Sequence, residues 1–104
     1  MRRLAAAIVL AAASSALAAE PQPPAHARVC APCHGPLGVS VQPDAPNLAG
    51  QPRAYLVAQL AAYRSGKRAH EQMSVIAKGL TDAQIEELAE WFSALAIEVK
   101  RPPG

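Results

Sequence analysis

The stretch Cys30-Ala31-Pro32-Cys33-His34 decides how this chain is interpreted. Its two thiols lie about one helical turn apart, so each can add to one of the vinyl groups on the edge of a porphyrin ring. The imidazole that follows is then held beneath the ring centre, where a neutral ring nitrogen can coordinate iron. A Cys-x-x-Cys-His run is the signature of covalent haem attachment. It predicts thioether bonds at Cys30 and Cys33 and an iron ligand at His34.

Other chemistries use the same residue types. Cys30 and Cys33 could form a disulfide or a thioredoxin-like redox pair, but a redox pair needs a βαβ context, and the sequence shows no strand pattern. A structural zinc site would need a fourth ligand at finger-like spacing, and the chain has no second pair of cysteines. Haem attachment is favoured, and the thiol and zinc alternatives stay open at this point.

The first 19 residues have the layout of a secretory signal peptide. Arg2 and Arg3 precede an apolar run over residues 4–13, and a segment of small residues follows. The run is too short for a membrane span, which takes about 20 apolar residues. We expect cleavage after Ala18 or Ala19 and export to the periplasm, with no membrane span in the mature chain. An uncleaved amphipathic anchor is the alternative.

Processing changes the charge of the chain. The full sequence has ten Lys and Arg residues against eight Asp and Glu, a formal net charge of +2. Removal of residues 1–19 takes away two arginines and no acidic residue, so the mature chain is formally neutral. Its charge therefore gives no evidence for nucleic-acid binding. The remaining chain, about 85 residues, is a single small domain that is marginally stable without a staple, and a buried porphyrin would supply the missing core.

Hydrophobic periodicity predicts an all-α fold of about four helices. Residues 20–24 form an extended lead-in, a short first helix begins near Pro24, and Pro32 should make this helix end or kink near the cysteines. Glycines and prolines make residues 35–46 a loop. Two further helices are predicted over 52–65 and 69–78, ended by Gly66 and Gly79.

The last helix has the clearest pattern. Thr81 and Gln84 form a capping box, and Leu80 and Ile85 can form a hydrophobic staple. Apolar residues then continue along one face of the helix. That stripe comprises Ile85, Leu88, Ala89, Phe92, Leu95 and Ala96. The chain ends in a flexible tail over residues 100–104.

Met73 is the candidate for the second axial ligand of the iron. It is the only methionine outside the signal peptide, and a thioether opposite histidine is the pairing that raises the reduction potential. A methionine is more often a gap-filling core residue, so the assignment depends on the haem. His70 is a competing ligand three residues earlier. His26 is expected to be a surface or packing histidine.

The motifs taken together resemble the class I c-type cytochromes, both the short bacterial single-haem members and one half of the related two-haem proteins. The resemblance covers nearly all of residues 25–97. It is carried by Cys30-Ala31-Pro32-Cys33-His34-Gly35, Pro46-Asn47-Leu48-Ala49-Gly50-Gln51, Tyr55, Gln59-Leu60, Gly66, Met73 and Leu80-Thr81-Asp82.

The resemblance implies a cytochrome c fold over residues 20–99, wrapped around one covalent haem c whose edge is partly exposed. It implies that the first and last helices cross, that the Pro46 carbonyl accepts the proton of the outer nitrogen of His34, and that Leu48 packs on the porphyrin. Many members have an apolar or aromatic residue where this chain has His26. The crossing would then depend on Ala27 and Val29 packing against Trp91 or Phe92.

These features predict a periplasmic carrier that transfers single electrons between Fe(III) and Fe(II), not an enzyme. Redox proteins would dock at the haem edge through a transient interface, and the chain would be a monomer or part of a transient complex. Two alternatives remain open. The chain is a haem subunit of a larger redox complex, or it binds ligands or peroxide at an open sixth position. Three arginines are candidate partners for the haem propionates, namely Arg53, Arg64 and Arg68.

Overall fold

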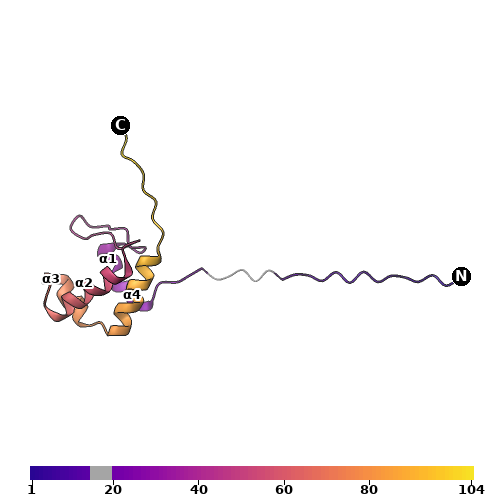
Figure 1. Cartoon of the computed structure of the whole chain (residues 1–104), viewed down its shortest axis with the longest axis horizontal. Coiled ribbons are helices and arrows are strands. Elements are labelled where there is room, and N and C mark those ends of the chain that lie inside the picture. Colours follow the sequence, from indigo (N-terminus) through magenta and orange to yellow (C-terminus); the bar gives the residue numbers. More distant parts are fainter. Residues whose placement is uncertain (15–19) are drawn as a thin grey trace.

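The computed structural model of the chain describes residues 1–14 and 20–104. Within these residues it contains one 3-10 helix, four α-helices and no strand. In chain order the elements are η1 (Ala25–Val29), α1 (Ala31–His34), α2 (Arg53–Ser65), α3 (Glu71–Lys78) and α4 (Asp82–Ala94). Figure 1 shows α3 and α4 on opposite sides of the helical body, with α2 between them. The predicted all-α fold of about four helices is confirmed.

The chain breaks its first helix at the cysteines, as predicted, but not at Pro32. η1 begins after Pro24, and in its last hydrogen bond the Cys30 amide donates to the Ala27 carbonyl over 3.0 Å. α1 begins at the next residue. Pro32 lies in the first turn of α1, where its missing N–H costs no hydrogen bond. The break therefore comes two residues earlier than the proline.

α2 and α3 follow the predicted pattern with one shift. α2 ends at Gly66, which has a left-handed φ of 85°, and its buried face includes Leu56 and Tyr63. α3 begins at Glu71, two residues later than predicted. The reason is that His70 is extended, with φ of −152°, and caps the helix with its ring.

α4 has the predicted capping box. The Gln84 amide donates to the Thr81 hydroxyl over 3.1 Å, and the Thr81 amide donates to the Gln84 side chain over 3.0 Å. Leu80 and Ile85 are both buried in the core, as the staple requires. The predicted apolar stripe was too long, because α4 ends at Ala94 and the next residues leave the helix. Leu95 still packs partly on the core, whereas Ala96 is exposed.

The core lies where η1 and α2 pack against α4. It consists of Ala27, Leu56, Leu80, Ile85, Leu88, Ala89 and Phe92. Ala27 joins Phe92 there as predicted, but the prediction for Val29 was wrong, since this residue is 55% exposed. His26 joins η1 to α4 by polar contacts. Its Nε2 lies 3.2 Å from the Gln84 carbonyl and 3.5 Å from the Glu87 carboxylate.

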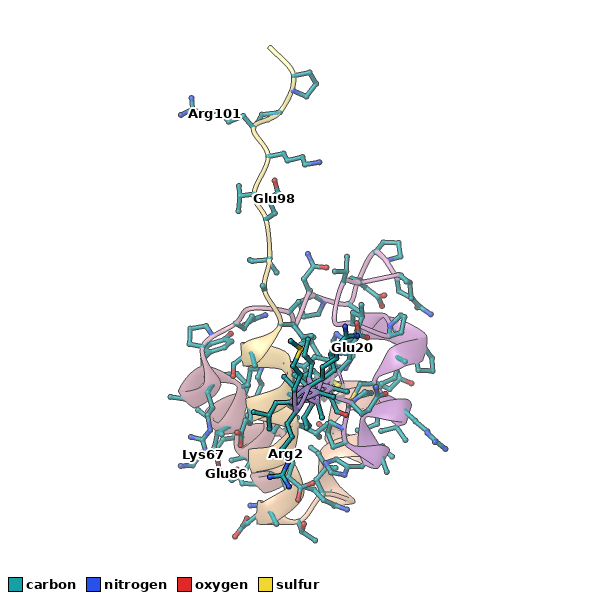
Figure 2. The ribbon with its side chains drawn as sticks, turned by 90° about the vertical axis from the view of Figure 1, so that its right-hand side faces the viewer. Arg2, Glu20, Lys67, Glu86, Glu98 and Arg101 are labelled. Carbon is teal, nitrogen blue, oxygen red and sulfur yellow. The ribbon has the colours of Figure 1, made fainter. Side chains whose placement is uncertain are left out.

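Neither end of the described chain takes part in this core. Residues 1–14 and 96–104 are exposed and have no regular secondary structure. Figure 2 shows the segment with Glu98 and Arg101 extending away from the helices. No helix in the described ranges is long and apolar enough to cross a membrane. The predicted cleavage site after Ala18 or Ala19 lies outside the described residues.

The loop over residues 35–46 packs closely against α4 at Gly38. This glycine has a φ of 73°, and its carbonyl accepts the amides of Leu48 and Ala49 over 2.7 and 3.0 Å. A Cβ at this position would lie 2.8 Å from the Ala49 nitrogen and 2.9 Å from the Phe92 ring. The backbone therefore approaches α4 more closely than any other residue would allow.

Replacing Gly38 with alanine is expected to lower the free energy of unfolding by more than about 1 kcal/mol, because strain and overlap add. Denaturant unfolding of the haem-loaded protein measures this change. Gly66→Ala is the matched control, since it has the same sign of φ at 85° but nothing within 4 Å of the added methyl group. Equal losses in the two variants would show that the contact with α4 contributes nothing.

Candidate haem site

A cavity of about 500 Å³ is lined by residues from all four α-helices and from the segment before α2. Its lining includes every residue of the predicted site, namely Cys30, Cys33, His34 and Met73. Cys33 and His34 come from α1, Cys30 directly precedes it, and Met73 comes from α3. The fold thus brings a methionine 39 positions further along the chain to the same cavity as the Cys-x-x-Cys-His run.

His34 is buried at the end of α1 and is held by one hydrogen bond. Its Nδ1 lies 2.8 Å from the Pro46 carbonyl oxygen, as the resemblance implied. A carbonyl oxygen can only accept, so Nδ1 has the proton and Nε2 keeps its lone pair. That is the tautomer that an imidazole needs to coordinate a metal, with its other nitrogen oriented by a backbone carbonyl.

The two cysteines are free and half-buried. Burial raises the pKa of the Cys30 thiol. A redox-active pair works through a thiolate, which requires a lowered pKa, so the structure disfavours the thioredoxin-like alternative. In the part of the chain that the structure describes, no three His, Cys, Asp or Glu side chains lie together as a metal-binding group. A structural zinc site, which takes four such ligands, is disfavoured as well.

Met73 is half-buried at the third position of α3. Its backbone amide donates to the Nδ1 atom of His70 over 3.2 Å. His70 also lines the cavity, although it is exposed to solvent. Both candidates for the sixth position therefore reach the same cavity, and the structure distinguishes them by the hydrogen bonds that they make.

The three candidate arginines have different partners. Arg53 forms an ion pair with Glu86, and Arg64 lies 2.5 Å from the Asp82 carboxylate. Arg68 alone among the three lines the cavity. Its guanidinium lies 4.7 Å from the centre of the Tyr63 ring. Arg68 is therefore the candidate that the geometry retains for a propionate.

Sequence reasoning missed part of the cavity wall. The α2 residues Leu60 and Tyr63 line the cavity, as does Ile76 of α3. Val29 also lines it, which explains why this residue is absent from the core. Helical spacing identifies a buried face but does not say whether protein or a cofactor covers it.

The cavity and its donor groups fit haem c. Most of its lining is apolar, with Leu48, Leu56 and Phe92 among the residues that could contact a porphyrin. The same wall holds two thiols at the attachment spacing and one imidazole in the metal-binding tautomer. An all-α domain with this cavity defines a protein that holds haem covalently.

Comparisons with known proteins agree. The family model "Cytochrome c" matches residues 24–96. The chain therefore belongs to the cytochrome c family, and its cofactor is covalently attached haem c with iron. It is a class I member related to one half of the two-haem cytochromes. The chain is 45% identical over 65 residues to cytochrome c4 of Thiocapsa roseopersicina, covering 62% of this chain and 33% of the relative.

Two further relatives differ in length. The chain is 42% identical over 67 residues to a thiosulfate dehydrogenase electron acceptor of Stutzerimonas stutzeri, covering 62% of this chain and 31% of the relative. It is 38% identical over 68 residues to cytochrome c-554(548) of Halomonas halodenitrificans, covering 62% of this chain and 82% of the relative. The chain thus spans about a third of the first curated relatives, but most of a short one.

A solved structure has the same fold. Cytochrome c4 of Acidithiobacillus ferrooxidans matches with a TM-score of 0.61 and 39% identity. The match covers 71% of this chain and 40% of the other. The predicted cytochrome c fold is thereby confirmed.

Proposed function

We propose that this chain is a periplasmic one-electron carrier with a single haem c. In the proposal, Cys30 and Cys33 form the thioether bonds, and His34 and Met73 are the axial ligands. The observation that carries it is the cavity of about 500 Å³, which these four residues line together. When bound, haem c supplies an iron centre that gains and loses one electron at a time.

His34 and Met73 have separate roles in this proposal. The hydrogen bond to the Pro46 carbonyl fixes the orientation of the His34 ring and raises the basicity of Nε2. The Met73 thioether is a soft donor, which favours the reduced metal and raises the reduction potential. Two ligands that stay in place through the redox cycle keep the reorganisation small and exclude other ligands.

The apolar wall of the cavity limits access of water. Leu56 and Phe92 are buried, and Leu48 is half-buried beside them. These side chains lower the local dielectric, and the hydrophobic shell around a metal site tunes its potential. The proposal needs no substrate pocket and assigns no catalytic residue.

Redox proteins are the proposed partners. One relative is named as an electron acceptor of thiosulfate dehydrogenase, which supports a role between other redox proteins. The proposed mature chain is formally neutral, so strong steering by charge is not expected. Small, transient interfaces are typical of redox encounters.

Mass spectrometry and the spectrum of the denatured pyridine adduct test the proposal. Protein made with a working haem maturation system is expected to have the mass of one haem, on the peptide that contains Cys30 and Cys33. The same mass tests cleavage after Ala18 or Ala19. The Cys30→Ala/Cys33→Ala double variant is the control and should have no adduct. An unmodified mass for the wild-type chain would contradict the proposal.

A further inference from the structure

We infer that His70 is a positioning residue that holds Met73 in place, and not a competing ligand of the iron. This role presupposes the His34 and Met73 ligation proposed above. The observation behind it is the 3.2 Å hydrogen bond from the Met73 amide to His70 Nδ1, at the first turn of α3.

The hydrogen bond determines the protonation of the His70 ring. A backbone N–H can only donate, so Nδ1 of His70 must accept with its lone pair. In a neutral imidazole the proton then lies on Nε2. Neither ring nitrogen has a lone pair left for a metal while the cap is in place. Ligation by His70 would break the bond that begins α3.

Met73 is enclosed in a reciprocal set of bonds. The His70 amide donates to the Ser74 hydroxyl over 3.0 Å, and the Ser74 amide donates to the His70 carbonyl, also over 3.0 Å. Together with the bond from the Met73 amide, these contacts close the first turn of α3 on both sides of the methionine. The first half of the arrangement is that of a capping box, with a histidine in the usual place of serine or threonine, but the bond back to the His70 amide comes from Ser74, one position beyond the residue that closes a capping box.

The His70 ring is itself oriented by α2. It meets the edge of the Tyr63 ring, with centroids 6.4 Å apart and planes at 67°. Tyr63 is buried, and the Arg68 guanidinium lies 4.7 Å from its centre while donating to Gln59 over 2.7 Å. A continuous set of contacts therefore runs from α2 to the amide of Met73.

The imidazole of His70 is long enough to make two contacts, which a serine at this position could not do. The imidazole reaches across to Tyr63 while its Nδ1 still meets the Met73 amide, so a single residue caps α3 and ties it to α2. A helix of eight residues gains little stability from its own hydrogen bonds. The position of Met73 therefore depends on this cap more than it would in a longer helix.

Imidazole titration of the oxidised, haem-loaded protein tests the inference, because added imidazole competes with Met73 for the sixth position. His70→Ala is expected to bind imidazole about fivefold more tightly than wild type, the factor that corresponds to loss of a typical helix cap. The weak far-red absorption band of methionine-ligated oxidised haem should persist with reduced intensity. His70→Asn keeps a capping side chain and should restore imidazole affinity to within about twofold of wild type.

Thr81→Ala is the matched control. This substitution removes the cap of α4, and Thr81 does not line the cavity. Both alanine variants should unfold at a lower temperature than wild type, but imidazole affinity should change only in His70→Ala. Equal imidazole affinities in these two variants would overturn the inference.

The methionine variant separates this inference from the proposed function. If the far-red band is present in wild type and lost in Met73→Ala, the proposed ligation holds and the His70 result stands by itself. If wild type lacks the band, and His70→Ala opens the sixth position, then His70 is the ligand. That outcome would overturn both the proposed ligation and the role of His70.

Discussion

Haem-free protein is expected to lose most of its helical circular dichroism signal and its cooperative thermal transition. The cavity of about 500 Å³ would have to be filled by water or closed by collapse. Engineered cavities of about 150 Å³ already cost small proteins several kcal/mol. The whole stability of a domain is only about 5–15 kcal/mol.

The composition of the core makes the loss more severe. Of its seven buried residues, five also line the cavity, and only Ala27 and Ile85 do not. Without haem these five residues would keep their contacts on one side only. No disulfide staples the chain, because Cys30 and Cys33 are the two cysteines of the sequence and they are not joined to each other. A domain of this size rarely folds with half a core.

Far-ultraviolet circular dichroism with thermal melting measures the effect. The comparison pairs haem-loaded wild type with the Cys30→Ala/Cys33→Ala variant produced without haem maturation. Unmodified wild-type chain, kept reduced, controls for the substitutions themselves. A helical haem-free chain that melts cooperatively would contradict the expectation and show that α2 and α4 are sufficient for the fold.

The features that sequence analysis predicted well depend on contacts between near neighbours. Thr81 and Gln84 are three residues apart, and each bond of their capping box is local. Gly66 ends α2 because a left-handed φ is needed there. The Cys-x-x-Cys-His run is equally local, and it predicted one wall of the cavity without any knowledge of the fold.

The errors come from contacts between distant segments. Phe92 shows this at the end of α4. Its carbonyl would accept the Ala96 amide if the helix continued, but it accepts the Gly50 amide over 2.9 Å and the Leu95 amide over 3.4 Å instead. Gly50 lies on the segment before α2, so no periodicity within α4 could predict where the helix ends. The exposure of Val29 has the same kind of cause, because it depends on the cavity that other elements form.

The residue types of the candidate site could be predicted from the sequence, but the hydrogen bonds and ion pairs around them could not. Met73 was predicted as a ligand because few sulfur ligands were available, and the fold brings it to the cavity. His70 was interpreted as its rival, since residue type and proximity alone cannot show which nitrogen is engaged. The arginines were indistinguishable in sequence. Their ion pairs with α4 separate Arg53 and Arg64 from Arg68.

Replacing Met73 with alanine is expected to remove the far-red band, open the sixth position and lower the reduction potential. The loss of the thioether removes the donor that favours the reduced metal. We expect a fall on the order of 0.1 V or more, within the roughly 0.8 V that axial ligands span in haem proteins. The reduced variant should also bind carbon monoxide rapidly, whereas wild type should not.

Val75→Ala is the matched control for this variant. Val75 lies on the same helix, is 72% exposed and does not line the cavity, so its loss shortens an α3 side chain without touching the site. Its spectrum, potential and carbon monoxide binding should equal those of wild type. Survival of the far-red band in Met73→Ala would show that the sulfur is not a ligand.

Met73→His separates the closing of the sixth position from the chemistry of the atom that closes it. An imidazole on α3 can fill the position, so carbon monoxide binding should be as slow as in wild type. The potential should nevertheless stay low, because imidazole favours the oxidised metal more than a thioether does. If Met73→His restored the potential as well, exclusion of solvent would control it and not the sulfur. A low potential with a closed site would assign the effect to the thioether of Met73.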